Sequence, residues 1–564
     1  MNTSQLKKFA QFSRRNLMEQ VSHTLRRVLA KESAARREQA AAVKKLEDQI
    51  ALSDEAVVVE QVAYVWFNRF CALRFMDLNR YNRIGLVSPA EGGTQPEILA
   101  EAKMGHIDES VVSDESIRAN IFALLGGTAP SQNPQAEAYR LLLVAACNGH
   151  HKAMPFLFER IDDYSELLMP EDLLSEGSIL AQTRKAMTAE VCDDVEVIGW
   201  LYQFYISEKK DAVFDALKKN KKITPENIPA ATQLFTPHWI VRYLVENSLG
   251  RLWMLNRPES RLAEQMAYYI QPETVEEDVL QIESVEEIKV CDPACGSGHM
   301  LTYAFDLLYA MYEEEGYDAA EIPEKILTKN LFGVEIDGRA GALAAFALSM
   351  KARAKQRRFF RKQVRPNICV LSPVRFAEDE LSEYMDFIGR DLFTESLQAT
   401  LSQFGEVDNF GSLIRPVLTD VKGVVQLLET KDVSDQLFLK PTHEKVLHVL
   451  QQADYLSPKY HVVIANPPYM GSKGMNGRLG EWLKENYPDV KSDLFSAFIV
   501  RNTEMTLPKG QLGFMSPFVW MFISSYEKLR CFLIDQKTIT SLVQLEYSGF
   551  DGATVPICTF NCAK

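Results

Sequence analysis

The sequence lacks several features that would assign the protein to a particular class. No apolar run reaches the roughly 18 residues that a membrane helix needs. The first residues, MNTSQLKKFAQFSRRNL, lack the apolar core of a signal peptide. The nine cysteines include no CxxC pair. These absences argue against a membrane-spanning chain and against a disulfide scaffold, and they predict a cytoplasmic protein with reduced thiols.

Metal-binding and nuclease motifs are also missing. Cys291 and Cys295 stand four residues apart, but no second pair of ligands lies nearby, so we expect two small buried thiols and no metal site. Residues 1 to 225 show no Asp…Glu-x-Lys set behind a strand pattern, which argues against a fused restriction nuclease. We find no convincing internal repeats.

The charge balance is acidic overall and basic in places. The formal net charge of -14 argues against a uniformly basic nucleic-acid binder, although the field at a groove matters more than the total. The stretch KARAKQRRFFRKQVR, residues 351 to 365, is strongly basic. It fits a solvated helix end or a phosphate contact equally well.

The chain changes character near residue 225. Before it, apolar residues recur at three- and four-residue spacing, which predicts an α-helical N-terminal domain over 1 to 225, ending in a polar linker at 218 to 229. After it, short apolar runs alternate with helical stretches. The predicted strands are 287 to 293, 331 to 337, 367 to 372, 461 to 467, 510 to 517, 540 to 547 and 555 to 560.

This alternation predicts an α/β fold with a mostly parallel, doubly wound sheet over 226 to 564. The last two strands are separated by SGFDGAT, which is short enough for one antiparallel hairpin. About 90 residues separate the third and fourth strands, too many for one crossover. We therefore expect a helical insertion at about 374 to 460.

The first chemically informative stretch is VCDPACGSGHM, in which a strand ends at Asp292 and a glycine turn leads into a helix. Ligands of open α/β sheets bind at the carboxyl ends of strands, and glycines let backbone approach them closely. The full GxGxxG fingerprint is absent, because Leu301 stands where the third glycine would be. This weakens a nicotinamide assignment, and the turn alone is a weak signal.

The second stretch is GVEID, which places Glu335 and Asp337 at the end of the next strand. An acid at this position accepts hydrogen bonds from ribose hydroxyls. Two solvated strand-end carboxylates would give the same pattern.

The third stretch is IANPPYMG, where an apolar strand stops at Asn466, Pro467, Pro468 and Tyr469. Prolines cannot continue a sheet ladder, so the strand presents a rigid turn. The Asn466 amide oxygen and the Pro467 carbonyl could accept from an aromatic amine and favour localisation of its lone pair, while Tyr469 could stack on the ring. A plain Asn-Pro turn is the alternative for these residues alone. The following loop, 471 to 478, contains three glycines and fits either a closing lid or a surface loop.

In this order, DPACGSG, GVEID and NPPY resemble motifs I, II and IV of S-adenosylmethionine-dependent N6-adenine DNA methyltransferases. LFTPHWIVRYLV, 234 to 245, is similar to their motif X, and its place before motif I is that of the gamma class. DLFSAF and GQLGFMSP match the motifs that follow. N-terminal stretches such as YVWFNRFCALRFM narrow the resemblance to the PglX family of BREX (bacteriophage exclusion) defence systems.

The resemblance implies a Rossmann-like methyltransferase sheet and assigns roles to residues. It implies adenine N6 methylation in double-stranded DNA by a defence modification enzyme, with S-adenosyl-L-methionine as cofactor, other BREX proteins as partners, and no metal or membrane. A C-terminal target-recognition domain of the family is expected to be absent here, so weak activity of this chain alone is expected. The strand at 367 to 372 departs from the family, because it ends in Ser372 where an acid often stands. The implied cofactor-binding residues are Thr236, Pro237, Asp292, Pro293, Ala294, Gly296, Gly298, Glu335, Ile336 and Asn466, and the implied catalytic residues are Asn466, Pro467, Pro468 and Tyr469.

Two other classes of function fit the same residues. The turn chemistry equally suits an RNA base amine or a protein glutamine amide. A non-catalytic subunit that binds cofactor and serves recognition or assembly in a defence complex is the other alternative, favoured by the acidic chain.

Overall fold

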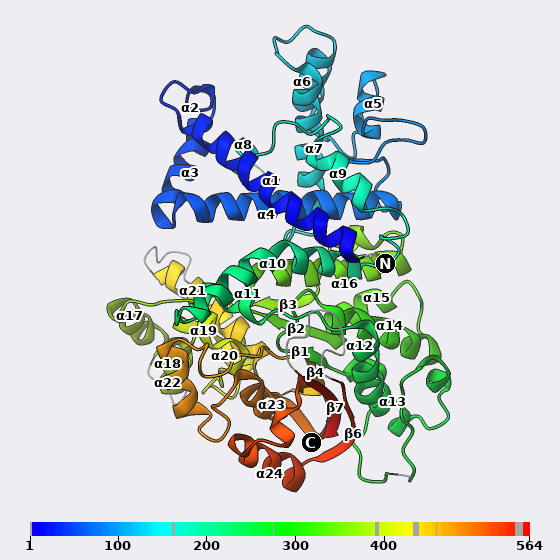
Figure 1. Ribbon diagram of the computed structural model, residues 1–564, viewed down its shortest axis with the longest axis vertical. Coiled ribbons are helices and arrows are strands. Elements are labelled where there is room, and N and C mark those ends of the chain that lie inside the picture. The colour runs from blue at the N-terminus through cyan, green and yellow to red at the C-terminus, as the bar shows by residue number, and fades with distance from the viewer. Residues whose placement is uncertain are drawn as a thin grey trace. The chain divides into compact units, whose positions relative to one another are not determined.

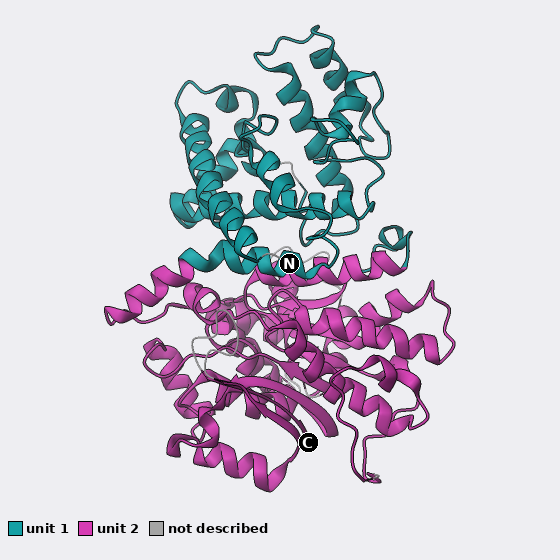
Figure 2. Ribbon diagram, turned by 45° about the vertical axis from the view of Figure 1, so that its right-hand side comes forward, with its two compact units in different colours: residues 1–208, 356–365 teal, residues 209–355, 366–564 magenta. Residues whose placement is uncertain are grey.

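The computed structural model describes residues 3–160, 164–274, 276–389, 394–431, 439–457, 459–546 and 556–564. The chain divides into two compact units, residues 1–208 with 356–365, and residues 209–355 with 366–564 (Figure 2). The predicted boundary after residue 225 falls inside the second unit, and a functional boundary there stays a prediction. Within the described residues, no helix combines the length and the apolar character needed to span a membrane.

The first unit is helical, as the periodicity predicts. Its central helix α4 is buried on almost every side, because α1 packs along it and rings from α10 pack against it. The Tyr64 ring of α4 meets Tyr205 of α10 edge-on at 5.4 Å. The helices are α1 (Thr3–Leu29), α2 (Ala34–Glu38), α3 (Ala40–Leu52), α4 (Glu55–Leu78), α5 (Glu97–Lys103), α6 (Glu115–Leu125), α7 (Pro134–His151), α8 (Tyr164–Leu167), α9 (Ile179–Ala186) and α10 (Glu196–Lys218), the last of which runs into the second unit.

The basic stretch divides between the two units. Helix α16 (Gly338–Lys355) ends in the second unit, and residues 356–365, with the short helix η6 (Phe359–Lys362), group with the first. Arg357, Arg358 and Arg361 are exposed. A phosphate contact of this stretch therefore stays an open prediction.

The second unit contains one seven-stranded sheet within the described residues, in the order β3-β2-β1-β4-β5-β7-β6. Figure 1 labels the strands of this sheet except β5. β1, β2, β3, β4 and β5 pair in parallel, and β7 is antiparallel to both β5 and β6. The predicted α/β sheet with one antiparallel hairpin is confirmed, although the SGFDGAT connection lies outside the described residues. The strands are β1 (Val290–Asp292), β2 (Leu331–Glu335), β3 (Asn367–Val370), β4 (Tyr460–Ala465), β5 (Thr506–Pro517), β6 (Thr538–Gln544) and β7 (Ile557–Ala563).

The strand order positions the site. From β1 the chain winds outward to β2 and β3, and then returns to β4 on the other side of β1. Ligands of such sheets bind where the order reverses, beyond the carboxyl ends of the two central strands. β1 and β4 are those strands, with Val290 paired to Val462 and Cys291 to Val463. Val462, Val463 and Ala465 are fully buried, as a central strand requires.

Helices cover and connect these strands. Those before and between the first three strands are η1 (Pro225–Asn227), α11 (Ile228–Thr232), α12 (His238–Val245), the π-helix η2 (Glu246–Gly250), α13 (Arg251–Asn256), η3 (Arg261–Gln265), η4 (Val285–Glu287), α14 (His299–Glu314), α15 (Ile322–Lys325), the π-helix η5 (Ile326–Asn330) and α16. Those after β4 are α22 (Gly477–Asn486), α23 (Leu494–Met505), η9 (Phe518–Met521), η10 (Ser524–Tyr526) and α24 (Glu527–Gln536). Pro225 and Pro229 lie at the first turns of η1 and α11, where proline is well tolerated, rather than acting only as stops.

The described residues between β3 and β4 contain helices and no strand. They are α17 (Glu378–Ile388), α18 (Thr394–Gln403), η7 (Phe404–Glu406), α19 (Val407–Phe410), η8 (Gly411–Leu413), α20 (Val421–Glu429) and α21 (Leu439–Tyr455). Arg501 of α23 fastens this segment to the sheet domain, because its buried guanidinium donates to the carbonyls of Ser412, Ile414 and Leu456.

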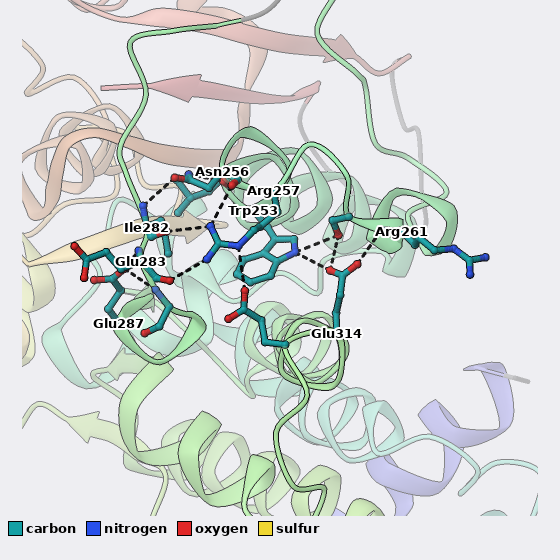
Figure 3. A network of polar contacts seen from close by, with 12 residues as sticks. Trp253, Asn256, Arg257, Arg261, Ile282, Glu283, Glu287 and Glu314 are labelled. Carbon is teal, nitrogen blue, oxygen red and sulfur yellow. Dashed lines mark hydrogen bonds and ion pairs between the residues drawn. The ribbon is translucent and has the colours of Figure 1, made fainter.

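A polar network fixes the chain ahead of β1 (Figure 3). The indole N–H of Trp253, within α13, donates to a carboxylate oxygen of Glu314 in α14 at 3.1 Å. The Arg257 guanidinium donates to the carbonyls of Ile282 and Glu283, at 3.2 and 2.9 Å. The network therefore ties the helices that follow motif X and motif I to the segment entering the sheet.

Candidate active site

The turn after β1 begins with a buried carboxylate. Asp292 is 3% exposed, and one of its oxygens accepts from the Ala294 N–H at 3.1 Å. Burial raises the pKa of Asp292 to about 8, and the nearby Glu335 carboxylate adds to the rise. The Cys295 N–H donates to the Val334 carbonyl at 3.0 Å, which joins the turn to β2.

Two glycines of this turn have different tasks. Gly296 and Gly298 both adopt the left-handed region, with φ of 53° and 89°. A Cβ on Gly298 would lie 3.1 Å from the Ala344 backbone of α16, so glycine there allows the helix to pack closely. A Cβ on Gly296 would meet no atom within 4 Å, so this side of the turn is open to a ligand.

The two acids after β2 also separate by role. The Glu335 carboxylate accepts from three backbone N–H groups, those of Gly296 at 2.8 Å and of Ile336 and Asp337 at 2.9 Å. Loss of surrounding water raises the pKa of Glu335 to about 7 even with these donors. Asp337 instead accepts from the Arg339 N–H in the first turn of α16. Glu335 is thus built into the turn after β1 and is not a freely solvated strand end.

The Asn466 amide, in the turn after β4, is hydrogen-bonded at both its NH₂ and its oxygen. Its NH₂ donates to the Leu234 carbonyl at 3.2 Å and to the Thr236 hydroxyl oxygen at 3.1 Å. Its Oδ1 accepts from the Tyr469 hydroxyl at 2.7 Å. Pro467 between them is buried and Pro468 partly buried. The amide is therefore fixed before any ligand arrives, and its oxygen retains a second lone pair.

Tyr469 lies in apolar surroundings. Its ring meets Phe495 of α23 edge-on at 6.3 Å, and burial raises the pKa of its phenol well above the usual value. The phenol therefore remains protonated and can only donate to Asn466 through its single hydrogen.

The segment before α12, which carries Thr236 and Pro237, lies beside the turn after β4. The ring of Phe235 packs edge-on against His299, the first residue of α14, at 4.0 Å. Thr236 is buried, and Pro237 precedes the first turn of α12. The structure places Thr236 against Asn466, a contact that its predicted role near a cofactor carboxylate does not include.

The structure also shows contacts that the sequence reasoning missed. The Asp493 carboxylate, in DLFSAF, accepts from the Met470 N–H at 2.9 Å, and burial raises its pKa to about 6. The Lys222 ammonium donates to the Lys473 carbonyl at 2.7 Å, and the Ile223 N–H donates to the Gly474 carbonyl at 3.1 Å. These bonds hold the first residues of the glycine loop, and closure of the loop as a lid stays a prediction.

The segment between β3 and β4 reaches the site as well. The Ser412 hydroxyl donates to the Pro293 carbonyl, and a Cβ on Gly411 would lie 3.2 Å from the Ile336 side chain. Ser372, after β3, is engaged elsewhere, because its N–H donates to Gln452 at 2.9 Å. Motif spacing could not reveal these partners, because each lies at least 75 residues from the residue that it contacts.

No group of three or more His, Cys, Asp or Glu side chains in the described ranges is arranged to hold a metal ion. Cys291 and Cys295 are buried free thiols, as expected.

Comparisons with known proteins place the sequence beside DNA methylases. The family described as Eco57I restriction-modification methylase matches residues 329–550, and the MmeI DNA-methyltransferase domain matches residues 273–371. The chain is 41% identical over 527 residues to the adenine-specific methyltransferase BrxX of Escherichia coli O9:H4 (strain HS), covering 88% of this chain and 43% of that protein.

A second relative is the adenine-specific methyltransferase PglX of Lacticaseibacillus casei (strain Zhang), at 35% identity, covering 88% of this chain and 42% of that protein. Among solved structures, the Type IIL restriction-modification enzyme MmeI in complex with DNA has a TM-score of 0.42 at 12% identity, covering 100% of this chain and 57% of that chain. The chain spans less than half the length of the two curated relatives. The predicted resemblance is confirmed: over most of its length, this chain is a relative of the adenine-specific methyltransferases BrxX and PglX.

Proposed function

We propose that this chain is the catalytic region of an enzyme that methylates adenine N6 in double-stranded DNA with S-adenosyl-L-methionine, as the modification enzyme of a bacterial anti-phage defence system. One observation carries the proposal. A rigid neutral turn after β4, with the amide oxygen of Asn466 fixed, lies beside two largely desolvated acids, Asp292 at the end of β1 and Glu335 at the end of β2.

The acids fit a cationic cofactor that carries hydroxyls. In the described part of the chain, no lysine or arginine forms an ion pair with Asp292 or Glu335. Desolvated carboxylates that accept only from backbone N–H groups favour a ligand that supplies positive charge or further hydrogen-bond donors. S-adenosylmethionine carries an ammonium, a sulfonium and a ribose diol. Asp292 would hold its amino-acid end and Glu335 its ribose, with Ile336 against the adenine.

The neutral turn fits an aromatic amine. When bound, the cofactor supplies a methyl group already activated by positive charge, so orientation of the nucleophile provides much of the acceleration. Asn466 Oδ1 and the Pro467 carbonyl would accept the two amine hydrogens and orient the nitrogen lone pair. Tyr469 would hold the extruded base by stacking, as in other enzymes that act on flipped bases.

The relatives support this substrate class by name, since both are called adenine-specific methyltransferases. They are also more than twice as long as the matched part of this chain. We propose that choice of the DNA sequence, and assembly with other BREX proteins, rest mainly on regions beyond the matched part.

The test is transfer of a labelled methyl group from S-adenosylmethionine to double-stranded DNA, RNA and protein extract. It uses the protein in its full native reading frame, with Asn466→Ala as the blank. We expect label in DNA at adenine N6. Label in RNA or protein alone would replace the proposed substrate, and tight cofactor binding without transfer to any acceptor would favour a non-catalytic subunit.

A further inference from the structure

The Asn466 side chain has acceptors on one side and a donor on the other. Its NH₂ faces the Leu234 carbonyl and the Thr236 hydroxyl, and its Oδ1 faces the Tyr469 hydroxyl. The partners on the NH₂ side lie 230 or more residues away in sequence, in the segment that precedes α12.

This arrangement answers a question that the motif alone leaves open. The oxygen and nitrogen of an asparagine amide have almost the same size and shape, so packing does not decide which one faces a ligand. The proposed chemistry works only if the oxygen faces the target amine, because an NH₂ would oppose the amine hydrogens with hydrogens of its own.

The Leu234 carbonyl breaks this symmetry. A carbonyl cannot donate, so rotating the amide by half a turn would place two carbonyl-type oxygens against each other. Thr236 adds a second acceptor and fixes the torsion of the amide plane. Its hydroxyl hydrogen stays available for another acceptor, which is compatible with a contact to the cofactor carboxylate.

We infer that residues Leu234 to Thr236 form a positioning element that fixes which end of the Asn466 amide faces the target amine. This inference rests on the proposed function for its catalytic meaning. Thr236 acts through Asn466 and is a positioning residue. The consequence is that substitutions before α12 change the rate of methyl transfer separately from cofactor affinity.

The first test uses Thr236→Val, which keeps the shape and removes the acceptor, with Thr236→Ser as the conservative variant. The control is Thr232→Val, because the Thr232 hydroxyl donates only to the Ile228 carbonyl of its own helix. The readouts are the single-turnover rate of transfer to DNA and two affinities. One is for 5′-methylthioadenosine, a cofactor fragment without the carboxylate, and the other is for S-adenosylhomocysteine, which keeps the carboxylate.

We expect the rate of Thr236→Val to fall about tenfold, equivalent to about 1.4 kcal/mol, with affinity for the fragment retained. Thr236→Ser should recover most of the rate, and Thr232→Val should match the wild type. An unchanged rate in Thr236→Val would overturn the role of its hydroxyl. A fall in affinity for S-adenosylhomocysteine without a fall in rate would show that Thr236 serves only the cofactor.

The second test does not depend on activity. In Asn466→Asp, an ionised carboxylate would place an oxygen against the Leu234 carbonyl, whereas the neutral acid can donate to it. The folded protein should therefore raise the pKa of the new acid. The stability of the neutral form is present at low pH and is lost as the pH rises through that pKa.

The control for burial alone is Asn409→Asp. Asn409 is more buried than Asn466, and each oxygen accepts from one donor, the Asn476 NH₂ at 2.9 Å and the Tyr469 hydroxyl at 2.7 Å. The acceptor on the NH₂ side of Asn409 is the Asn476 Oδ1 at the longer distance of 3.5 Å, so an ionised carboxylate meets less repulsion there than against the Leu234 carbonyl. We expect the melting temperature of Asn466→Asp, relative to wild type, to fall as the pH rises above about 4, the ordinary pKa of an aspartate, and that of Asn409→Asp to change less. Equal pH dependence in both variants would refute the positioning element, whereas a wild type that methylates nothing would refute the proposed function and leave this result standing.

Discussion

Two turns at the same edge of the sheet are built from different chemical groups. The turn after β1 uses glycines, backbone N–H donors and desolvated acids, and the turn after β4 uses prolines, a neutral amide and a phenol. The strands that carry them are adjacent and parallel. The difference suits the proposed function, in which the charged groups serve cofactor binding and the fixed amide orients the target amine.

Removal of the Asn466 amide should have the largest effect on methyl transfer. Asn466→Ala should lower the single-turnover rate by about 10²- to 10³-fold, the usual loss when one preorganised hydrogen-bonding group at a reaction centre is deleted. Cofactor affinity, measured by calorimetry, should change little because the acids belong to the other turn. A variant that still transfers methyl groups at a tenth of the wild-type rate would contradict this division.

A substitution in the turn after β1 should instead lower stability by disturbing the packing of α16. Gly298→Ala places a methyl group 3.1 Å from the Ala344 backbone, whereas Gly316→Ala meets no atom within 4 Å at a similar φ of 78°. Both variants strain the backbone, so their difference isolates the close approach of α16. In denaturant unfolding we expect Gly298→Ala to be about 1–3 kcal/mol less stable than Gly316→Ala. Equal losses of stability in the two variants would mean that α16 can move to accommodate the added methyl group.

Two substitutions should separate the role of the Tyr469 ring from that of its hydroxyl. Tyr469→Ala should weaken the productive DNA complex by about 1–3 kcal/mol, the range for one base stacked on an aromatic ring. Tyr469→Phe keeps the ring and loses only the bond to Asn466, so its effect on transfer at limiting DNA should be smaller. If Phe and Ala proved equally damaging, the hydroxyl rather than the ring would be the essential part.

The buried acid after β1 should make cofactor binding depend on pH. The pKa of Asp292 is raised to about 8, so a cationic cofactor must displace a proton below that pH, and its affinity should rise by up to about tenfold per pH unit between pH 6 and 8. Asp292→Asn should bind weakly and with a flatter profile.

The same carboxylate affects the stability of the ligand-free protein. Its neutral form stabilises the fold at low pH, and that contribution is lost as the pH rises from about 4 through about 8. The melting temperature of wild type should therefore fall relative to Asp292→Asn over this range. A difference that is constant with pH would place the pKa of Asp292 near its ordinary value.

The sequence predicts the sheet and the strand-end motifs because both are local patterns. All seven predicted strands appear within a few residues of their expected positions, since runs such as Val462 to Ala465 are short, apolar and bounded by turn residues. Glycine and proline mark the two turns for the same reason.

The partners that tune those motifs could not be predicted. Thr236 lies 230 residues from Asn466, and Ser412 lies 119 residues from Pro293. Such pairs depend on how helices return to the sheet, and a single sequence records no trace of that pairing. The raised pKa of Asp292 is likewise a property of its burial, which a motif does not contain.

The contacts of Lys222 and Ile223 with residues 472 to 474 bear on how the catalytic unit could be shortened. A chain cut at the predicted boundary, beginning at residue 226, would retain every motif and lose the residues that pin the loop beside the catalytic turn. Proteases would then cleave that loop more readily. The resulting loss of activity would be wrongly attributed to removal of the N-terminal unit. A cut at residue 209 keeps the pin in place.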